Sequence, residues 1–131
     1  MSEKVNKYID YWISVAKHDL DVAIVLFESK KYDSCLFFGH LSIEKILKGL
    51  WVKNNNMDFP PKTHNLLKLA NETKIDFSKE DKKFFEILNE FNIEARYPDY
   101  KLTFYKICTE EFTKEKFDKI KELFKCILEK L

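Results

Sequence analysis

A single arginine is the residue in this chain that most clearly indicates specific chemistry. Of 23 basic residues, Arg96 alone is an arginine and all the others are lysines. A guanidinium binds phosphate or carboxylate through two parallel hydrogen bonds, which the point charge of a lysine cannot imitate. We therefore take Arg96 as the main candidate for a phosphate contact. The alternative is a structural ion pair with a helix end or a carboxylate.

Two neighbours of Arg96 are further candidates for ligand contact. Tyr97 could stack on a base, although packing into a core is the more frequent fate of an aromatic residue. Asp99 follows Pro98 and is as typical of a turn or helix cap as of a ligand contact. The ligand-binding hypothesis for this segment therefore depends mainly on Arg96.

Lysines and histidines upstream are weaker candidates for binding an anion. Lys45 and Lys48 lie three residues apart, so a helix places them on one face beside Glu44. That face could meet phosphate, but we favour a solvated stripe with an ion pair between Glu44 and Lys48. His40 shares its face with apolar residues, which favours a hydrogen-bonded histidine in or beside the core. His64 either binds a ligand or only orients its loop.

Several common cofactor signatures are missing from the sequence. Glycine occurs only at Gly39 and Gly49, so neither a P-loop nor a dinucleotide fingerprint can form, and side chains would have to hold any phosphate. The histidines show no metal-binding spacing, and we expect no metal and no cofactor. Three widely spaced cysteines are expected to be reduced and to fill the core: Cys35, Cys108 and Cys126.

Charge and hydropathy limit the partners that we expect. The net charge is only +1, so no global basic field drives nucleic-acid binding and a local patch would have to do so. No apolar run approaches the roughly 18 residues of a membrane span, and the N-terminus lacks a secretory signal. These features predict a cytoplasmic protein that does not associate with a membrane.

The pattern of apolar residues predicts an all-α fold. The chain has 131 residues, two glycines and three prolines, which favours one domain over 1–131 with few turns and long helices. Apolar residues at spacings of three and four predict an up-and-down bundle of four main helices plus one short helix. We place these helices near residues 5–27, 34–53, 64–70, 79–97 and 114–131, and an irregular crossing at 99–112.

Polar residues before the apolar stripes predict where the helices begin. We expect Asp33 or Ser34 to cap the second helix, Thr63 the short helix, and Ser78 the fourth. Thr113 is the expected cap of the last helix.

Three groups of motifs, in order, resemble the HEPN family, which is named for higher eukaryotes and prokaryotes and for proposed nucleotide binding. Trp12, Ala16, Asp19, Leu20 and Ala23 are similar to its W-x3-A-x2-D-L-x2-A opening. The segment from His40 to Lys48 resembles h-x3-E-K-x-L-K. The third group is the H-x-L turn at 64–66 and the A-R-Y-P-D segment at 95–99.

The resemblance implies a helical bundle that works as a homodimer, of the prokaryotic stand-alone type. It also implies a nucleotide or RNA ligand and, by analogy with some members, a nucleotidyltransferase partner protein in a toxin–antitoxin type system. On this basis the leading functional hypothesis is a non-catalytic or weakly catalytic module that binds nucleotide or nucleic acid.

Two other functions stay open at this point. The RNase branch of the family carries R-x4-6-H, but no histidine follows His64 in this sequence. We therefore expect no strong RNase activity, since a neutral imidazole is the usual base for the ribose hydroxyl. The runner-up is an RNase that uses Lys101, His64 or His40 in place of the missing histidine. The third hypothesis is a purely structural interaction module.

Overall fold

The computed structural model describes residues 2–131, which form helices and connecting turns without a strand over that range. Four helices are long and two are short, so the expected four main helices are confirmed but a second short helix was missed. The helices are α1 (Glu3–Glu28), α2 (Tyr32–Asn55), α3 (Leu66–Glu72), α4 (Lys79–Arg96), α5 (Thr103–Ile107) and α6 (Glu110–Leu128). None of them is long and apolar enough to cross a membrane.

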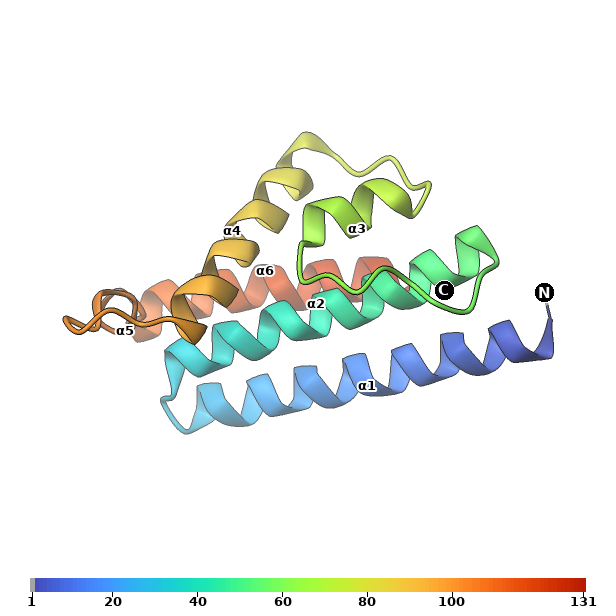
Figure 1. The fold of residues 1–131 in the computed structure, drawn as a ribbon. Helices are drawn as coiled ribbons and strands as arrows, with labels where there is room; N and C mark the ends of the chain where they lie inside the picture. Colours follow the sequence, from blue (N-terminus) through green and yellow to red (C-terminus); the bar gives the residue numbers. More distant parts are fainter. Residues whose placement is uncertain (1) are drawn as a thin grey trace.

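Helix α2 occupies the centre of the bundle (Figure 1). It packs along α1, with which it forms an antiparallel hairpin, and it also contacts α6, α4 and α3. The C-terminal end of α4 and the short helix α5 lie at the end of the bundle opposite to the chain termini. The segment that carries Arg96 therefore lies far from either end of the chain.

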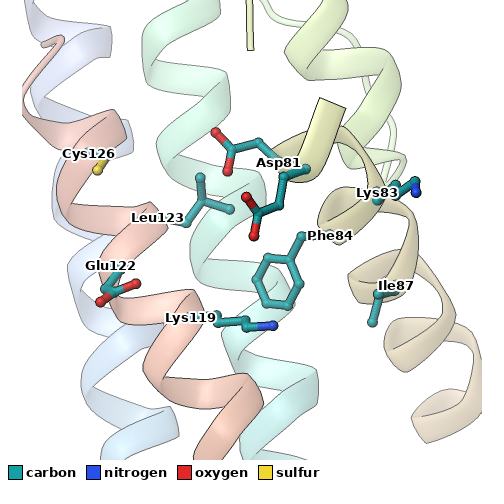
Figure 2. Close-up of a pocket in the computed structure, with 9 residues that line it drawn as sticks. Asp81, Lys83, Phe84, Ile87, Lys119, Glu122, Leu123 and Cys126 are labelled. Atoms are coloured by element: carbon teal, nitrogen blue, oxygen red, sulfur yellow. The ribbon is translucent and has the colours of Figure 1, made fainter. Parts of the chain in front are cut away.

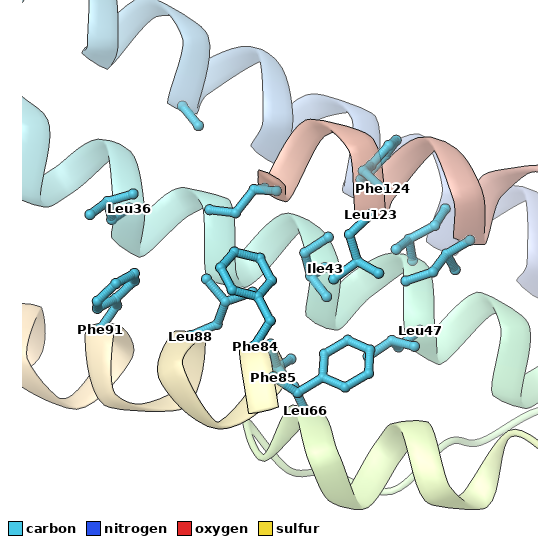
Figure 3. Packing of buried hydrophobic residues seen from close by; sticks show 14 of the residues in the cluster. Leu36, Ile43, Leu47, Leu66, Phe84, Phe85, Leu88, Phe91, Leu123 and Phe124 are labelled. Atoms are coloured by element: carbon cyan, nitrogen blue, oxygen red, sulfur yellow. The ribbon is translucent and has the colours of Figure 1, made fainter. Parts of the chain in front are cut away.

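The core is formed where α4 and α6 pack on α2 (Figure 3). Leu36, Ile43 and Leu47 of α2 are completely buried and face Phe85 and Leu88 of α4. Burial of each such side chain stabilises the fold by roughly 1.5–3 kcal/mol. Because neighbours surround α2 on several sides, it is apolar around much of its circumference, as expected of a buried helix.

The helix caps confirm some of the predicted starts and correct others. Ser78 caps α4 by accepting a hydrogen bond from the backbone N–H of Asp81 at 3.0 Å, as predicted. In α2 neither Asp33 nor Ser34 is the cap, because the helix already begins at Tyr32 without a side-chain cap. Asn65, and not Thr63, caps α3.

The segment expected to be an irregular crossing contains a short helix and the start of α6. Thr109 caps α6 through the N–H of Phe112, so the predicted cap at Thr113 is wrong and Thr113 is buried within the helix. Helix α5 begins after Leu102, which has a left-handed backbone with φ of 55°. Its apolar residue Phe104 is buried and packs its ring 5.5 Å from that of Phe91.

Two of the three cysteines fill the core as predicted. Cys35 and Cys108 are buried, and burial raises the pKa of each thiol to about 12, which keeps both in the unreactive neutral form. The prediction is wrong for Cys126, which is exposed. Its position on α6 faces the rim of a groove beside α4 instead of the core (Figure 2).

Candidate functional site

Arg96 is the last residue of α4 and its side chain is exposed. It makes no ion pair or hydrogen bond through its side chain with any residue in the described range 2–131. Its guanidinium lies 5.5 Å from the ring centroid of Tyr97. The structural ion pair that we considered as the alternative is therefore not present among these residues, and the guanidinium is free to bind a ligand.

Tyr97 and Tyr100 present aromatic surface beside Arg96. Their side chains are 69% and 91% exposed, so the interpretation of Tyr97 as a core residue is wrong. The reason is local, since α4 ends at Arg96 and the backbone of Tyr97 leaves the helix with φ of −128°. Tyr97 therefore does not continue the apolar stripe of α4. Exposed tyrosine rings can stack on unpaired bases.

Asp99 is used within the chain as a helix cap. Its two carboxylate oxygens accept hydrogen bonds from the N–H of Thr103 at 2.9 Å and from its hydroxyl at 2.7 Å. The backbone hydrogen bond from Thr103 is the main cause of the lowered pKa of Asp99. Of the two interpretations that the sequence left open, the cap describes its contacts, and Asp99 positions the Arg96 segment relative to α5.

Lys45 and Lys48 do not form the solvated stripe that we expected. The Nζ of Lys45 lies 3.2 Å from a carboxylate oxygen of Asp19 on α1, and the Nζ of Lys48 lies 3.1 Å from Glu44. The pair between Glu44 and Lys48 is confirmed, but both residues are buried because α1 covers this face of α2. Lys48 also lies over the ring of Trp12. Neither lysine is placed to meet an external phosphate.

His40 is completely buried and has both ring nitrogens occupied, which confirms the expectation of a hydrogen-bonded core histidine. Nε2 lies 2.9 Å from the carbonyl oxygen of His64, and Nδ1 lies 3.2 Å from the amide nitrogen of Asn92. Burial lowers the pKa of His40 to about 4, so the ring is neutral at physiological pH. Because a carbonyl can only accept, Nε2 carries the proton and Nδ1 accepts from Asn92.

His64 and Glu44 form a close pair that the sequence analysis did not identify. The Nδ1 of His64 lies 2.7 Å from one oxygen of Glu44, although the two residues are 20 positions apart. Glu44 is only 2% exposed, whereas the side chain of His64 is 58% exposed. The sequence signal was present, because both residues belong to the motifs quoted above, but nothing in their spacing indicated contact.

The predicted site residues fall into two separate regions. Arg96, Tyr97 and Asp99 lie together at the end of α4. The other candidates gather around the middle of α2: His40, Lys45, Lys48 and His64. Helix α4 links the two regions, since Asn92 contacts His40 and Arg96 follows Asn92 by four residues.

A groove of about 390 Å³ lies elsewhere, between the start of α4 and α6 (Figure 2). Phe84, Ile87 and Leu123 supply apolar surface, and charged residues of both signs surround it. None of the predicted site residues lines this groove. Its mixed charge gives it no preference for a phosphate.

The architecture places the chain in a class of small helical-bundle domains. A solved structure of the protein TT1696 from Thermus thermophilus superposes with a TM-score of 0.79 at 19% sequence identity. The match covers 94% of this chain and 98% of that one, so the two share a fold over nearly their whole length. None of the curated proteins that were compared with the chain matches it.

A comparison with family models assigns the chain to a family, which is a narrower class than its fold. The model of the HEPN domain matches residues 9–131, which is nearly the whole sequence. The chain therefore belongs to the HEPN domain family, as the motifs at 12–23, 40–48 and 95–99 indicated.

Proposed function

We propose that this protein is a non-catalytic or weakly catalytic module that binds a nucleotide or a nucleic acid, with Arg96 as its principal phosphate contact. The observation that carries the proposal is the unpaired guanidinium of Arg96 at the exposed end of α4, among residues 2–131. Arginine at such a position suits bidentate binding of phosphate. The exposed rings of Tyr97 and Tyr100 add surface on which a base can stack.

The proposal includes a homodimer that forms through the α5 region. Of ten large apolar or aromatic residues that are strongly exposed, six lie between Ile93 and Ile107, and four of these remain once Tyr97 and Tyr100 are assigned to the ligand. Leu102, Tyr105 and Ile107 are 46%, 60% and 49% exposed and lie on or next to α5. Several exposed apolar side chains on one short segment favour association with a partner. A second copy on this face would bring two Arg96 residues toward the same interface, leaving Tyr97 and Tyr100 for the ligand.

A nucleotidyltransferase partner in a toxin–antitoxin type system is the finer part of this proposal. Its support is the membership of the chain in the HEPN family and the apolar surface around α5, which either a second copy or another protein can cover. The test is whether the product of an adjacent nucleotidyltransferase gene, where one exists, co-purifies with this chain.

The experiment that tests the binding function is the conservative substitution Arg96→Lys. The variant keeps the positive charge but loses the paired hydrogen bonds, so its affinity for adenosine monophosphate and for a short single-stranded oligouridine should fall by about 1–3 kcal/mol. The melting temperature should barely change, because Arg96 makes no ion pair with the described residues. Calorimetric titration and thermal unfolding measure the two effects.

Lys125→Ala is the matched control for this experiment, because Lys125 is an exposed basic residue on α6, away from Arg96. It should bind both probes as the unchanged protein does. A melting temperature that falls by several degrees in Arg96→Lys while binding stays the same would assign Arg96 to structure and remove it from the site.

A further inference from the structure

The imidazole of His64 is fixed from the protein side and faces solvent on the other. Its Nδ1 is bonded to Glu44 at 2.7 Å, and its backbone carbonyl accepts the Nε2–H of His40 at 2.9 Å. The neighbouring Asn65 is held by Asn89 of α4 at 3.0 Å. Nε2 of His64 makes no hydrogen bond to any residue that the structure describes. One contact thus fixes the ring and two others fix the backbone of its loop, so the exposed side of the ring is held in position to contact something outside the chain.

The state of Glu44 determines which nitrogen of His64 faces outward. Burial alone would raise the pKa of this carboxyl, but the hydrogen bond from His64 and the charge and hydrogen bond of Lys48 outweigh burial and lower it. Glu44 is therefore ionised near neutral pH and only accepts hydrogen bonds. Nδ1 of His64 carries the proton toward Glu44, which leaves Nε2 as the nitrogen available to a ligand.

Two exposed lysines lie close to His64 in the sequence. Lys62 lies two residues before it and Lys68 four residues after it, and both are exposed. Neither lysine forms an ion pair with a residue in the described part of the chain, whereas Lys48 is neutralised by Glu44. The local charge therefore suits an anion, and it does so without the global basic field that the sequence lacks.

The distance between His64 and Arg96 indicates how many phosphates a ligand needs in order to contact both residues. Asn89 contacts Asn65 and accepts the N–H of Leu66 at 2.9 Å, so it marks the point on α4 beside the His64 loop. Arg96 follows Asn89 by seven residues, which corresponds to about 10 Å along a helix. One phosphate held by hydrogen bonds of about 3 Å does not span two such positions. Two phosphates of one strand can.

We propose that His64, with Lys62 and Lys68 beside it, is a second phosphate contact for a single-stranded nucleic acid whose other contact is Arg96. The proposal rests on the proposed function and narrows its ligand from a nucleotide to a strand. A single strand suits the site because Tyr97 and Tyr100 are exposed for stacking on unpaired bases.

When a phosphate oxygen is bound at Nε2, the ring donates one hydrogen bond to that oxygen and another through Nδ1 to Glu44. The titratable groups that contact His64 or its partner Glu44 are Glu44, Lys48 and His40, all on α2. His40 itself stays neutral near pH 7, because burial lowers its pKa to about 4.

The test compares His64→Ala and His64→Lys with His18→Ala, which removes an exposed histidine from α1. The probes are adenosine monophosphate and an oligouridine of about ten nucleotides, a length within the usual footprint of a single-strand site. For the oligouridine, His64→Ala should bind roughly tenfold or more weakly, and His18→Ala should bind normally. His64→Lys should retain most of the affinity, because a lysine also donates hydrogen bonds to a phosphate, and calorimetric titration measures all three variants.

The outcomes separate this inference from the proposed function. Adenosine monophosphate should bind equally to the unchanged protein and to His64→Ala. It has a single phosphate, which Arg96 binds, so it does not reach the second contact at His64. Equal oligouridine affinity in both proteins would overturn the role of His64 while leaving Arg96 in place. If the unchanged protein binds neither probe, the proposed function and this inference both fall.

Discussion

At the scale of single residues, the central feature is a set of buried polar groups that satisfy one another. Glu44 bonds to Lys48 and His64, and His40 bonds to Asn92 and to the backbone of His64. Unpaired, each of these groups would cost the fold several kcal/mol on burial. Fully paired, they hold the loop before α3 against α2 and α4 in one arrangement.

This network predicts that stability falls in mild acid. The pKa of His40 is about 4 in the folded chain, below its ordinary value of 6.5. Between these two values the unfolded chain binds a proton at His40 and the folded chain does not, so protonation favours unfolding. The contribution of His40 is complete above pH 6.5 and declines by about 2 kcal/mol as the pH falls from 6.5 to about 5. Denaturant unfolding across this range measures the decline.

The substitution His40→Gln should remove most of that decline, since glutamine does not titrate. His18→Gln, at an exposed position, should leave it unchanged. The lowered pKa of Glu44 also makes stability fall with pH, but only below pH 4.5, the ordinary pKa of this group. It therefore does not affect the comparison of the two variants between pH 6.5 and 5. An equal pH dependence in His40→Gln and the unchanged protein would show that His40 is not a neutral buried histidine.

The sequence predicted some of these residues well and others not at all. Arg96 was singled out because it is the one arginine in the chain, a signal that needs no knowledge of the fold. The pair of Glu44 with Lys48 followed from helical spacing. The contact of Glu44 with His64 could not be predicted, because it depends on how a loop 20 residues away returns to α2.

At the scale of elements, the packing of α1 on α2 depends on Gly49. A Cβ atom at this position would lie 3.2 Å from the Cβ of Trp12 on α1, so the absence of a side chain permits a close contact between the two helices. We predict that Gly49→Leu lowers the stability by about 1–3 kcal/mol, since the added atoms force the helices apart. Thermal unfolding measures this as a melting temperature that falls by several degrees.

Ser14→Leu serves as the comparison for this substitution, because Ser14 is an exposed residue of the same helix pair. Its stability should stay within about 0.5 kcal/mol of that of the unchanged protein. If Gly49→Leu melts at the same temperature as Ser14→Leu, the contact between α1 and α2 is not tight at Gly49.

The long helices were predictable and their exact starts were not. Apolar spacing of three and four identified α1, α2, α4 and α6, since each buries a continuous stripe. Capping was ambiguous where two candidates stood near each other. Thr109 and Thr113 are one helical turn apart, and the structure uses the first because Phe112 packs with the core. Helix α5 was missed because it has only five residues and carries too little periodicity to recognise.

At the scale of the whole molecule, the exposed apolar residues around α5 predict association. We expect sedimentation at micromolar concentration to give about twice the chain mass of 15.8 kDa. Tyr105→Glu should shift the species toward the monomer, because it places a charge in the apolar face. A monomer of 15.8 kDa for the unchanged protein would contradict the proposed dimer.

We also predict that the protein lacks strong RNase activity. His40 is buried with both nitrogens bonded, and no histidine follows Arg96 in the sequence. Incubation with single-stranded RNA in the presence of a chelator should leave most of the RNA intact. Rapid cleavage that Arg96→Ala abolishes would mean that another residue supplies the base, and His64 would be the first to test.

The most direct measurement for the central claim is a map of the ligand on the protein. Amide chemical shifts of isotope-labelled protein can be followed by NMR while adenosine monophosphate is added. The account predicts saturable shifts at the end of α4 and the turn into α5, from Arg96 to Lys101, and none in Arg96→Ala. Saturable shifts confined to the groove between α4 and α6, or no shifts at millimolar nucleotide, would contradict it.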